Sequence, residues 1–280
     1  MDVVALAGIG LLTGMTTVLF GFGGGFVAVP VVVWADAALG ADAMRVATAT
    51  SALVMVVNAG FATAVTPWRV LRALRGSGRL LLLLAAGASA GAAAAGFAPA
   101  GPARWAFVAY VALTIVDLLL RPGFLRPRAR EAVPGTPRPP ARTPRPPART
   151  PRPLPALLGA PVGAVAAFLG VGGSVLTVPA MRRAGHTMRV ATALANPLTL
   201  AIALPATAVA LCGAALPAAA DAHAHLVGLV DLRAASALLL GALPVIAVLR
   251  RRPPRISDRT HAWAYIGLLA MVTVAMPLAG

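Results

Sequence analysis

The sequence has no lysine, a single cysteine and few charged residues of any kind. Only 11% of its 280 residues are charged, whereas a soluble globular protein carries about 25%. With 59% hydrophobic residues and a mean hydropathy of +0.84, this shortage excludes an ordinary water-soluble domain. The lone Cys212 excludes an intrachain disulfide, and its apolar neighbours predict a buried, inert thiol.

Long apolar stretches take the place of the missing charge. Several of them reach the roughly 20 residues that a helix needs to cross a bilayer. The sequence therefore predicts an all-α polytopic membrane protein whose main partner is the lipid bilayer. The stretches are 3–20, 26–35, 46–66, 80–98, 105–120, 156–180, 190–212, 226–249 and 262–279.

The positive charge of the chain lies between these stretches. All 24 basic residues are arginines, and the net charge is +16. In a soluble protein this charge would suggest a nucleic-acid partner, but arginines between apolar segments are typical of cytoplasmic loops under the positive-inside rule. We therefore expect no nucleic acid as a partner.

A proline- and arginine-rich segment at 121–155 divides the chain. Its core repeats the unit Thr-Pro-Arg-Pro-Pro-Ala-Arg, and prolines at this density favour extended polyproline II over helix. We interpret 121–155 as a cytoplasmic linker between a first transmembrane repeat at 1–120 and a second at 156–280. A ligand for a proline-recognising domain and a contact with anionic lipid are alternatives for this linker.

The two halves share a series of motifs in the same order. The stretch MRVATAT at 44–50 returns as MRVATAL at 188–194, and RWAFVAY at 104–110 is echoed by HAWAYIG at 261–267. An internal duplication explains a series of matches in one order better than coincidence does.

Each half also carries a glycine cluster followed by a proline. GFGGGFVAVP spans 21–30 and GVGGSVLTVP spans 170–179. Glycine lowers the stability of a helix interior by roughly 1 kcal/mol relative to alanine, so each cluster predicts a broken helix that resumes at Phe26 or Val175. Broken backbone survives in hydrocarbon only where protein buries it or where it lines a watery cavity.

The resumed helices are candidates for an anion site. A helix N-terminus offers free N–H groups and a partial positive charge, and two such breaks meet near the midplane in inverted-repeat transporters. Here the donors would be the amides of Gly24, Gly25, Gly173 and Ser174, together with the Ser174 hydroxyl. Close helix packing at small residues is the alternative reading of the glycines.

Polar residues in the helices that follow support the site. Asn58 and Asn196 each place a carboxamide within an apolar stretch. Threonine and serine count for less singly, because they often bond carbonyls of their own helix. These weaker candidates are Thr48, Thr50 and Ser51 in the first half, and Thr192 and Thr199 in the second.

The distribution of arginine indicates how the halves insert. If each broken segment enters and returns to the side it came from, each half crosses three times and the two halves are inverted repeats. All arginine-rich loops then fall inside, which a model with four crossings per half does not achieve. These loops are 69–79, 121–152, 182–189 and 250–259.

The paired glycine–proline motif followed by an A-x-A-T-S-type helix, repeated across the linker, resembles the TauE/SafE family of sulfite exporters, also called sulfonate-uptake permeases. The resemblance implies a multi-pass inner-membrane transporter for sulfite, sulfonates or related small anions, driven by an ion gradient such as protons or sodium, with no cofactor. It carries over Thr50-Ser51 as the family's Thr-Ser pair, which Leu194-Ala195 replaces in the second half. The glycine–proline positions carried over are Gly21, Gly23, Gly24, Gly25, Pro30, Gly170, Gly172, Gly173 and Pro179.

Other readings remain open at this point. A transporter of a different small solute and an intramembrane enzyme are the alternatives, although no Walker A or H-E-x-x-H motif is present. Asp117 could relay protons, but Arg121 four residues on favours a salt bridge at the membrane boundary. His223 and His225 lack further ligands in sequence, so we expect no metal site there.

Arg45 and Arg189 occupy equivalent places in the repeated MRVATA motif, each at the start of an apolar stretch. Under the inverted-repeat hypothesis they face opposite sides of the membrane. Either could attract an anion into a vestibule, or simply mark the end of a helix.

The inverted arrangement predicts where three parts of the chain lie. We expect both chain ends outside the cell and the linker at 121–155 inside, because only this placement brings every arginine-rich loop to the cytoplasmic side. Cysteines introduced at the two ends should react with an impermeant maleimide in intact cells, and cysteines in the linker should not. A protected N-terminus would contradict the inverted arrangement.

Overall fold

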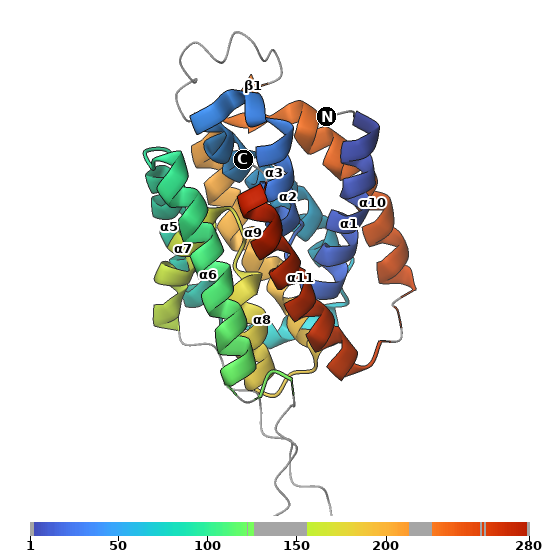
Figure 1. Ribbon diagram of the computed structural model, residues 1–280. Coiled ribbons are helices and arrows are strands. Elements are labelled where there is room, and N and C mark those ends of the chain that lie inside the picture. Colours follow the sequence, from blue (N-terminus) through green and yellow to red (C-terminus); the bar gives the residue numbers. More distant parts are fainter. Residues whose placement is uncertain are drawn as a thin grey trace, which may run out of the picture.

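The computed structural model describes residues 3–121, 123–125, 156–212, 226–252, 254 and 256–278. These residues form one bundle of helices (Figure 1) and a single short hairpin of β1 (Leu226–Val227) and β2 (Val230–Asp231). Nearly all of the predicted linker, and the histidines at 223 and 225, lie outside the described residues.

Among the described residues, six helices are long and apolar enough to cross a membrane. Their number and composition confirm the prediction of an all-helical, multi-pass membrane protein. They are α3 (Ala43–Ala64), α5 (Gly78–Ala95), α6 (Ala100–Leu120), α9 (Met188–Cys212), α10 (Leu232–Arg251) and α11 (Asp258–Leu278).

Two pairs of shorter helices flank the glycine clusters. The first cluster joins α1 (Val3–Phe20) to α2 (Gly25–Ala35), and the second joins α7 (Gly159–Leu169) to α8 (Ser174–Arg183). Both clusters therefore break the helix as predicted, although each helix resumes one residue earlier than expected. Short helical turns complete the bundle: η1 (Ala37–Asp42), α4 (Trp68–Leu71), η2 (Arg72–Leu74) and η3 (Ala156–Leu158).

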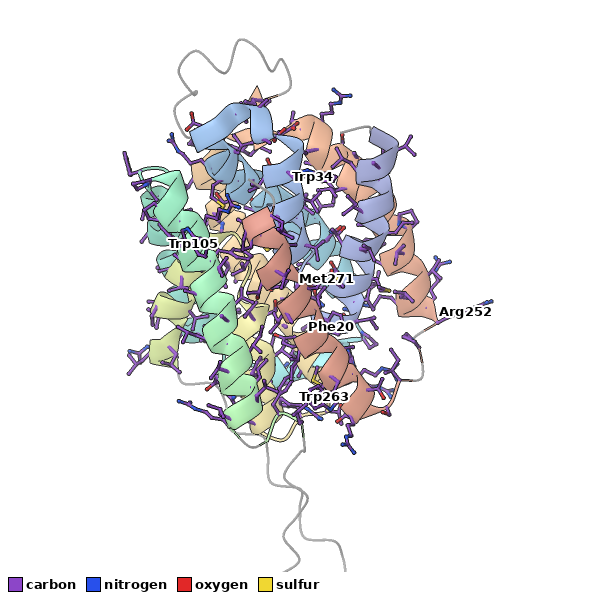
Figure 2. The ribbon with its side chains drawn as sticks, viewed as in Figure 1. Phe20, Trp34, Trp105, Arg252, Trp263 and Met271 are labelled. Carbon is purple, nitrogen blue, oxygen red and sulfur yellow. The ribbon has the colours of Figure 1, made fainter. Side chains whose placement is uncertain are left out.

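The chain returns to the end of the bundle from which each pair starts. In Figure 2, Phe20 at the end of α1 lies deep in the bundle, while Trp34 near the end of α2 lies close to the end at which α1 begins. The end of α8 returns to the end of α6, since Arg183 Nη2 lies 2.5 Å from a carboxylate oxygen of Asp117. In Figure 1 the start of α1 and the end of α11 lie at one end of the bundle, and the end of α6 lies at the other.

Arginines concentrate at one end of this bundle. Among the described residues, only Arg45, Arg104 and Arg233 belong to the end where α1 begins, because they lie within five residues of the starts of α3, α6 and α10. The remaining described arginines lie in or beside the connections at the opposite end, where α6 ends.

The first arm of each broken pair packs on a helix from the other half of the sequence. Gly10 of α1 lies against backbone atoms of Leu238 and Gly241 in α10, and Gly87 of α5 lies against the backbone of Ala160 in α7. Helices in lipid gain little from hydrophobicity when they associate, so small residues that let backbones approach supply the van der Waals contact. These glycines bind the halves to each other.

A pair of glycines on one helix tests this packing. A methyl group on Gly10 would overlap the carbonyl oxygen of Leu238, whereas one on Gly8 would meet nothing within 4 Å. We expect Gly10→Ala to lower the stability by about 1–3 kcal/mol, as overpacking does. Gly8→Ala should leave it unchanged or raise it by a fraction of 1 kcal/mol through helix propensity. Thermal unfolding of the two purified variants checks this, and equal melting temperatures would contradict the close approach.

Candidate functional site

The two glycine breaks meet in the interior of the bundle. A Cβ atom on Gly23 would lie 2.9 Å from the methyl group of Thr199 and 3.3 Å from Met55 Cγ. One on Gly172 would lie 2.9 Å from Met55 Sδ, 3.0 Å from the same Thr199 methyl group and 3.5 Å from the carbonyl oxygen of Phe22. Met55 of α3 and Thr199 of α9 are therefore the residues at which the breaks come together.

Each break is held by a hydrogen bond from the helix of the other half. The Ser51 hydroxyl on α3 shares its proton between the carbonyl of Gly170 at 3.0 Å and that of Thr48 in its own helix at 2.9 Å, and the Thr199 hydroxyl on α9 donates to the carbonyl of Gly21 at 3.4 Å. Gly21 and Gly170 have positive φ angles of 74° and 68°, which only glycine adopts readily. The side chains thus satisfy carbonyls that the broken helices leave free.

The start of α2 leaves backbone amides available. Gly24 precedes it with a φ of 84°, and the first N–H groups to reach a helical acceptor are those of Val27 and Ala28, which both donate to the Gly24 carbonyl. The amides of Gly25 and Phe26 therefore have no acceptor within the helix.

The start of α8 has the same arrangement. Leu176 and Thr177 donate to the Gly173 carbonyl, so the amides of Ser174 and Val175 have no acceptor within the helix. Free amides at a helix N-terminus are suited to an anion.

Two buried side chains beside these amides lack partners. Asn58 is fully buried, and neither Oδ1 nor Nδ2 of its carboxamide has a hydrogen-bond partner within the described residues. Its Nδ2 faces Gly24, because a Cβ atom there would lie 2.7 Å from it. The Ser174 hydroxyl is likewise buried without a partner. An unpartnered buried amide costs several kcal/mol, so these groups are suited to receive a ligand.

Other predicted site residues do not face the free amides at the starts of α2 and α8. The Thr50 hydroxyl accepts a hydrogen bond from the amide of Asp231 at 2.9 Å and so secures the β-hairpin rather than a break. Asn196 donates to the carbonyl of Thr192 at 3.2 Å and keeps Oδ1 unpartnered within the described part of the chain. Pro30 and Pro179 are buried within α2 and α8, beyond the first turn of each helix.

Two aromatic residues beside the breaks were not predicted from the sequence. The Tyr265 hydroxyl donates to the carbonyl of Ser174 at 3.1 Å, and Phe107 stacks on Phe26 with ring centroids 5.9 Å apart. The signal was available, because each of the two residues lies two positions after the tryptophan of its repeated stretch, HAWAYIG or RWAFVAY. They fix α11 and α6 against the starts of α8 and α2.

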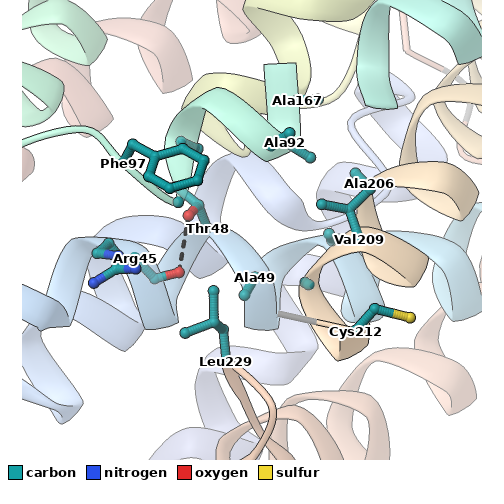
Figure 3. Close-up of a pocket in the computed structure, with 15 residues that line it drawn as sticks. Arg45, Thr48, Ala49, Ala92, Phe97, Ala167, Ala206, Val209, Cys212 and Leu229 are labelled. Carbon is teal, nitrogen blue, oxygen red and sulfur yellow. Dashed lines mark hydrogen bonds between the residues drawn. The ribbon is translucent and has the colours of Figure 1, made fainter. Parts of the chain in front are cut away.

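A cavity leads toward the breaks from the end where α1 begins. It has a volume of about 410 Å³, and Arg45, Thr48 and Cys212 are among its lining residues (Figure 3). Thr48 is also a neighbour of the second break, since a Cβ atom on Gly170 would lie 3.0 Å from its Cα. Cys212 is exposed, so the prediction of a buried thiol was wrong: the residue is the last of α9 and is among those that line the cavity.

A second cavity, of about 340 Å³, opens at the opposite end, between the start of α9 and the end of α10. Arg189, Thr192 and His261 are among its lining residues. A Cβ atom on Gly21 would lie 2.6 Å from the carbonyl oxygen of Thr192. The first cavity is therefore separated from the second break by α3, and the second cavity is separated from the first break by α9. No glycine of either cluster lines a cavity.

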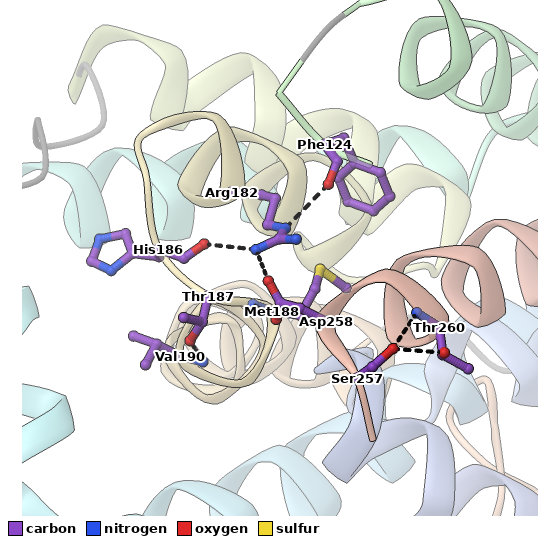
Figure 4. A network of polar contacts seen from close by, with 9 residues as sticks. All are labelled: Phe124, Arg182, His186, Thr187, Met188, Val190, Ser257, Asp258 and Thr260. Atoms are coloured by element: carbon purple, nitrogen blue, oxygen red, sulfur yellow. Dashed lines mark hydrogen bonds and ion pairs between the residues drawn. The ribbon is translucent and has the colours of Figure 1, made fainter. Parts of the chain in front are cut away.

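The ion pairs at the arginine-rich end are structural. Asp117 pairs with Arg121 at 2.8 Å and with Arg183, which confirms the salt bridge predicted at the end of α6. Arg182 is 1% exposed and pairs with Asp258, while its Nε donates to the carbonyl of Phe124 at 3.2 Å (Figure 4). These contacts join the ends of α6 and α8 to the start of α11.

The described residues contain no group of three or more histidine, cysteine, aspartate or glutamate side chains that could hold a metal ion. The expectation for His223 and His225 cannot be compared with the structure, because both lie in the undescribed segment between α9 and β1.

Six long apolar helices and two interrupted helix pairs in the described part of the chain define a multi-pass membrane protein of the transporter class. The chain matches the sequence model of the sulfite exporter TauE/SafE family over residues 6–276 and belongs to that family. No curated protein and no solved structure shows significant similarity to it.

The unpartnered carboxamide of Asn58 generates a prediction about stability. Asn58→Leu removes two buried polar atoms without hydrogen bonds and keeps a side chain of similar size. We expect the free energy of unfolding to stay constant or rise by about 1–3 kcal/mol, the usual cost of an unsatisfied group. Chemical or thermal unfolding of the purified variant in the absence of anions measures this. A marked loss of stability would mean that the carboxamide has a partner.

Proposed function

We propose that the protein carries a small anion such as sulfite or an organosulfonate across the cell membrane, and that the anion binds where α2 and α8 begin. The observation that carries the proposal is the fully buried Asn58 carboxamide, which has no partner among the described residues and faces Gly24, just before the amides of Gly25 and Phe26 that have no acceptor within α2. Its Nδ2 supplies two further donors. Ser174 Oγ and the amides of Ser174 and Val175 offer the corresponding donors from the second half.

The chemistry of this site suits an anion more than a cation. Its donors are N–H groups and a hydroxyl, and the starts of two helices add partial positive charge without a buried lysine or arginine. Membership of the TauE/SafE family supports the same substrate class. A transporter of a different small solute is the remaining alternative.

We further propose that residues 1–120 and 156–280 are inverted repeats, with the arginine-rich end in the cytoplasm. Exchanged contacts support this. The break at Gly21 packs against Thr192 of α9, and the break at Gly170 packs against Thr48 of α3. Thr48 and Thr192 hold the same place in the repeated MRVATA motif, so each half contacts the other in the same way.

In this proposal transport alternates between the two cavities. One cavity leads from each membrane face to a helix that covers a break, and Met55 and Thr199 fill the space between the breaks. Movement of α3 or α9 away from a break would open the anion site to one cavity while the other stays closed. Inverted repeats suit such motion, because each half can adopt the conformation of the other.

Transport by purified protein in proteoliposomes tests the proposal. Radiolabelled sulfite, an alkylsulfonate and sulfate are offered to the wild type and to Asn58→Leu and Ser174→Ala. Loss of a hydrogen bond to a charged group costs about 1.5–3 kcal/mol, so we expect kcat/KM to fall about 10- to 100-fold in each variant for the transported anion.

Thr207→Val is the matched control for these variants. The Thr207 hydroxyl is also buried without a partner in the described chain, but it lies near the end of α9, away from both breaks. We expect this variant to transport at the wild-type rate. Uptake of a neutral solute but of none of the anions would favour the alternative substrate class, and equal rates in all variants would remove the anion site from the starts of α2 and α8.

A further inference from the structure

The cavity at the arginine-rich end holds more positive charge than its acidic residue can neutralise. Its lining includes Arg189, Arg250 and Asp258. Asp258 is already engaged, because one carboxylate oxygen pairs with Arg182 and the other accepts a hydrogen bond from the amide of Met188 at 3.0 Å (Figure 4). The charges of Arg189 and Arg250 therefore have no acidic partner within this lining.

Arg250 has buried donor atoms without an acceptor in the described part of the chain. It lies in the last turn of α10, and its Nε and Nη2 atoms are buried with no hydrogen-bond partner among the described residues. Arg189 lies close enough for the two positive charges to repel each other. Buried guanidinium donors without an acceptor are unfavourable, and a second positive charge increases the cost. A bound anion would remove both costs.

We propose that Arg189 and Arg250 form a second anion site, which takes up a small oxyanion in this cavity before it reaches the starts of α2 and α8. The proposal rests on the proposed function for its role in transport. Guanidinium groups bind oxyanions through paired N–H···O bonds, and two of them suit sulfite or sulfate. Thr192 lines the same cavity and covers Gly21, so the site lies on the approach to the first break.

The cavity at the other end lacks this arrangement. Its lining contains a single arginine, Arg45, which pairs with Asp42 at 3.0 Å. We therefore expect the apparent affinity for the anion to depend on the membrane face to which it is added, with tighter binding from the arginine-rich end.

Transport from each face tests this asymmetry. Wild type, Arg189→Gln and Arg250→Gln are reconstituted in vesicles of known orientation, and sulfite is added to one face at a time. We expect KM at the arginine-rich face to rise at least 10-fold in both variants, while KM at the other face stays unchanged. Melting temperatures measured without anions should not fall, since Arg250 makes no hydrogen bond through the two buried atoms.

Arg252→Gln is the matched control. Arg252 lies two residues beyond Arg250, is exposed, and extends away from the bundle (Figure 2). The Arg252→Gln substitution removes the same charge from a residue that does not line the cavity, so the KM values of this variant should match those of the wild type. If all three variants behave alike, the second site is overturned and the proposed function remains.

Equilibrium binding separates the second site from transport itself. Radiolabelled sulfite is titrated onto the full-length protein in nanodiscs of neutral lipid and in nanodiscs that contain anionic lipid. Binding that Arg250→Gln weakens at least 10-fold supports the site even if the wild type transports no anion, a result that would refute the proposed function alone. Loss of this binding in anionic lipid would assign the two arginines to a lipid headgroup and overturn the proposal.

Discussion

The structure depends on how the interrupted backbone at the two glycine clusters is satisfied. In hydrocarbon each unpaired N–H or C=O group costs several kcal/mol, so a helix can break only where other groups take over its hydrogen bonds. Ser51 and Thr199 do this for the carbonyls of Gly170 and Gly21. Since each donor comes from the opposite half of the sequence, these two carbonyls depend on the other half for their hydrogen bonds.

This exchange extends to the helices around the breaks. The arm before each break packs on a long helix of the other half, α1 on α10 and α7 on α5, with glycines at the points of closest approach. The carbonyls of Gly21 and Gly170 have donors, but the amides of Gly25, Phe26, Ser174 and Val175 have no acceptor within their helices. The same interruption that constrains the fold thus creates the donors of the proposed anion site.

The described arginines at the arginine-rich end fall into two groups, those paired with acidic residues and those that are not. Arg182 and Arg183 are neutralised by Asp258 and Asp117, and these pairs join helices that are distant in sequence. Arg250 reaches no acid, and two of its buried nitrogen atoms have no hydrogen bond in the described chain. The sequence presents all of these residues alike, as arginines between apolar stretches, and only their neighbours in space separate structural pairs from candidate ligands.

Composition and local pattern were sufficient to determine the class of the protein, the long apolar helices and the positions of both breaks. Hydrophobic length and glycine propensity act within one segment, so they can be read without knowledge of the rest of the chain. Thr50 and Asn58 show that local pattern does not predict which partner a polar side chain will have. Both are polar residues of α3, yet Thr50 bonds the β-hairpin while Asn58 faces Gly24 with no partner. The difference depends on which residues of α1, α2 and the hairpin pack against each face of α3, and only the tertiary structure decides that.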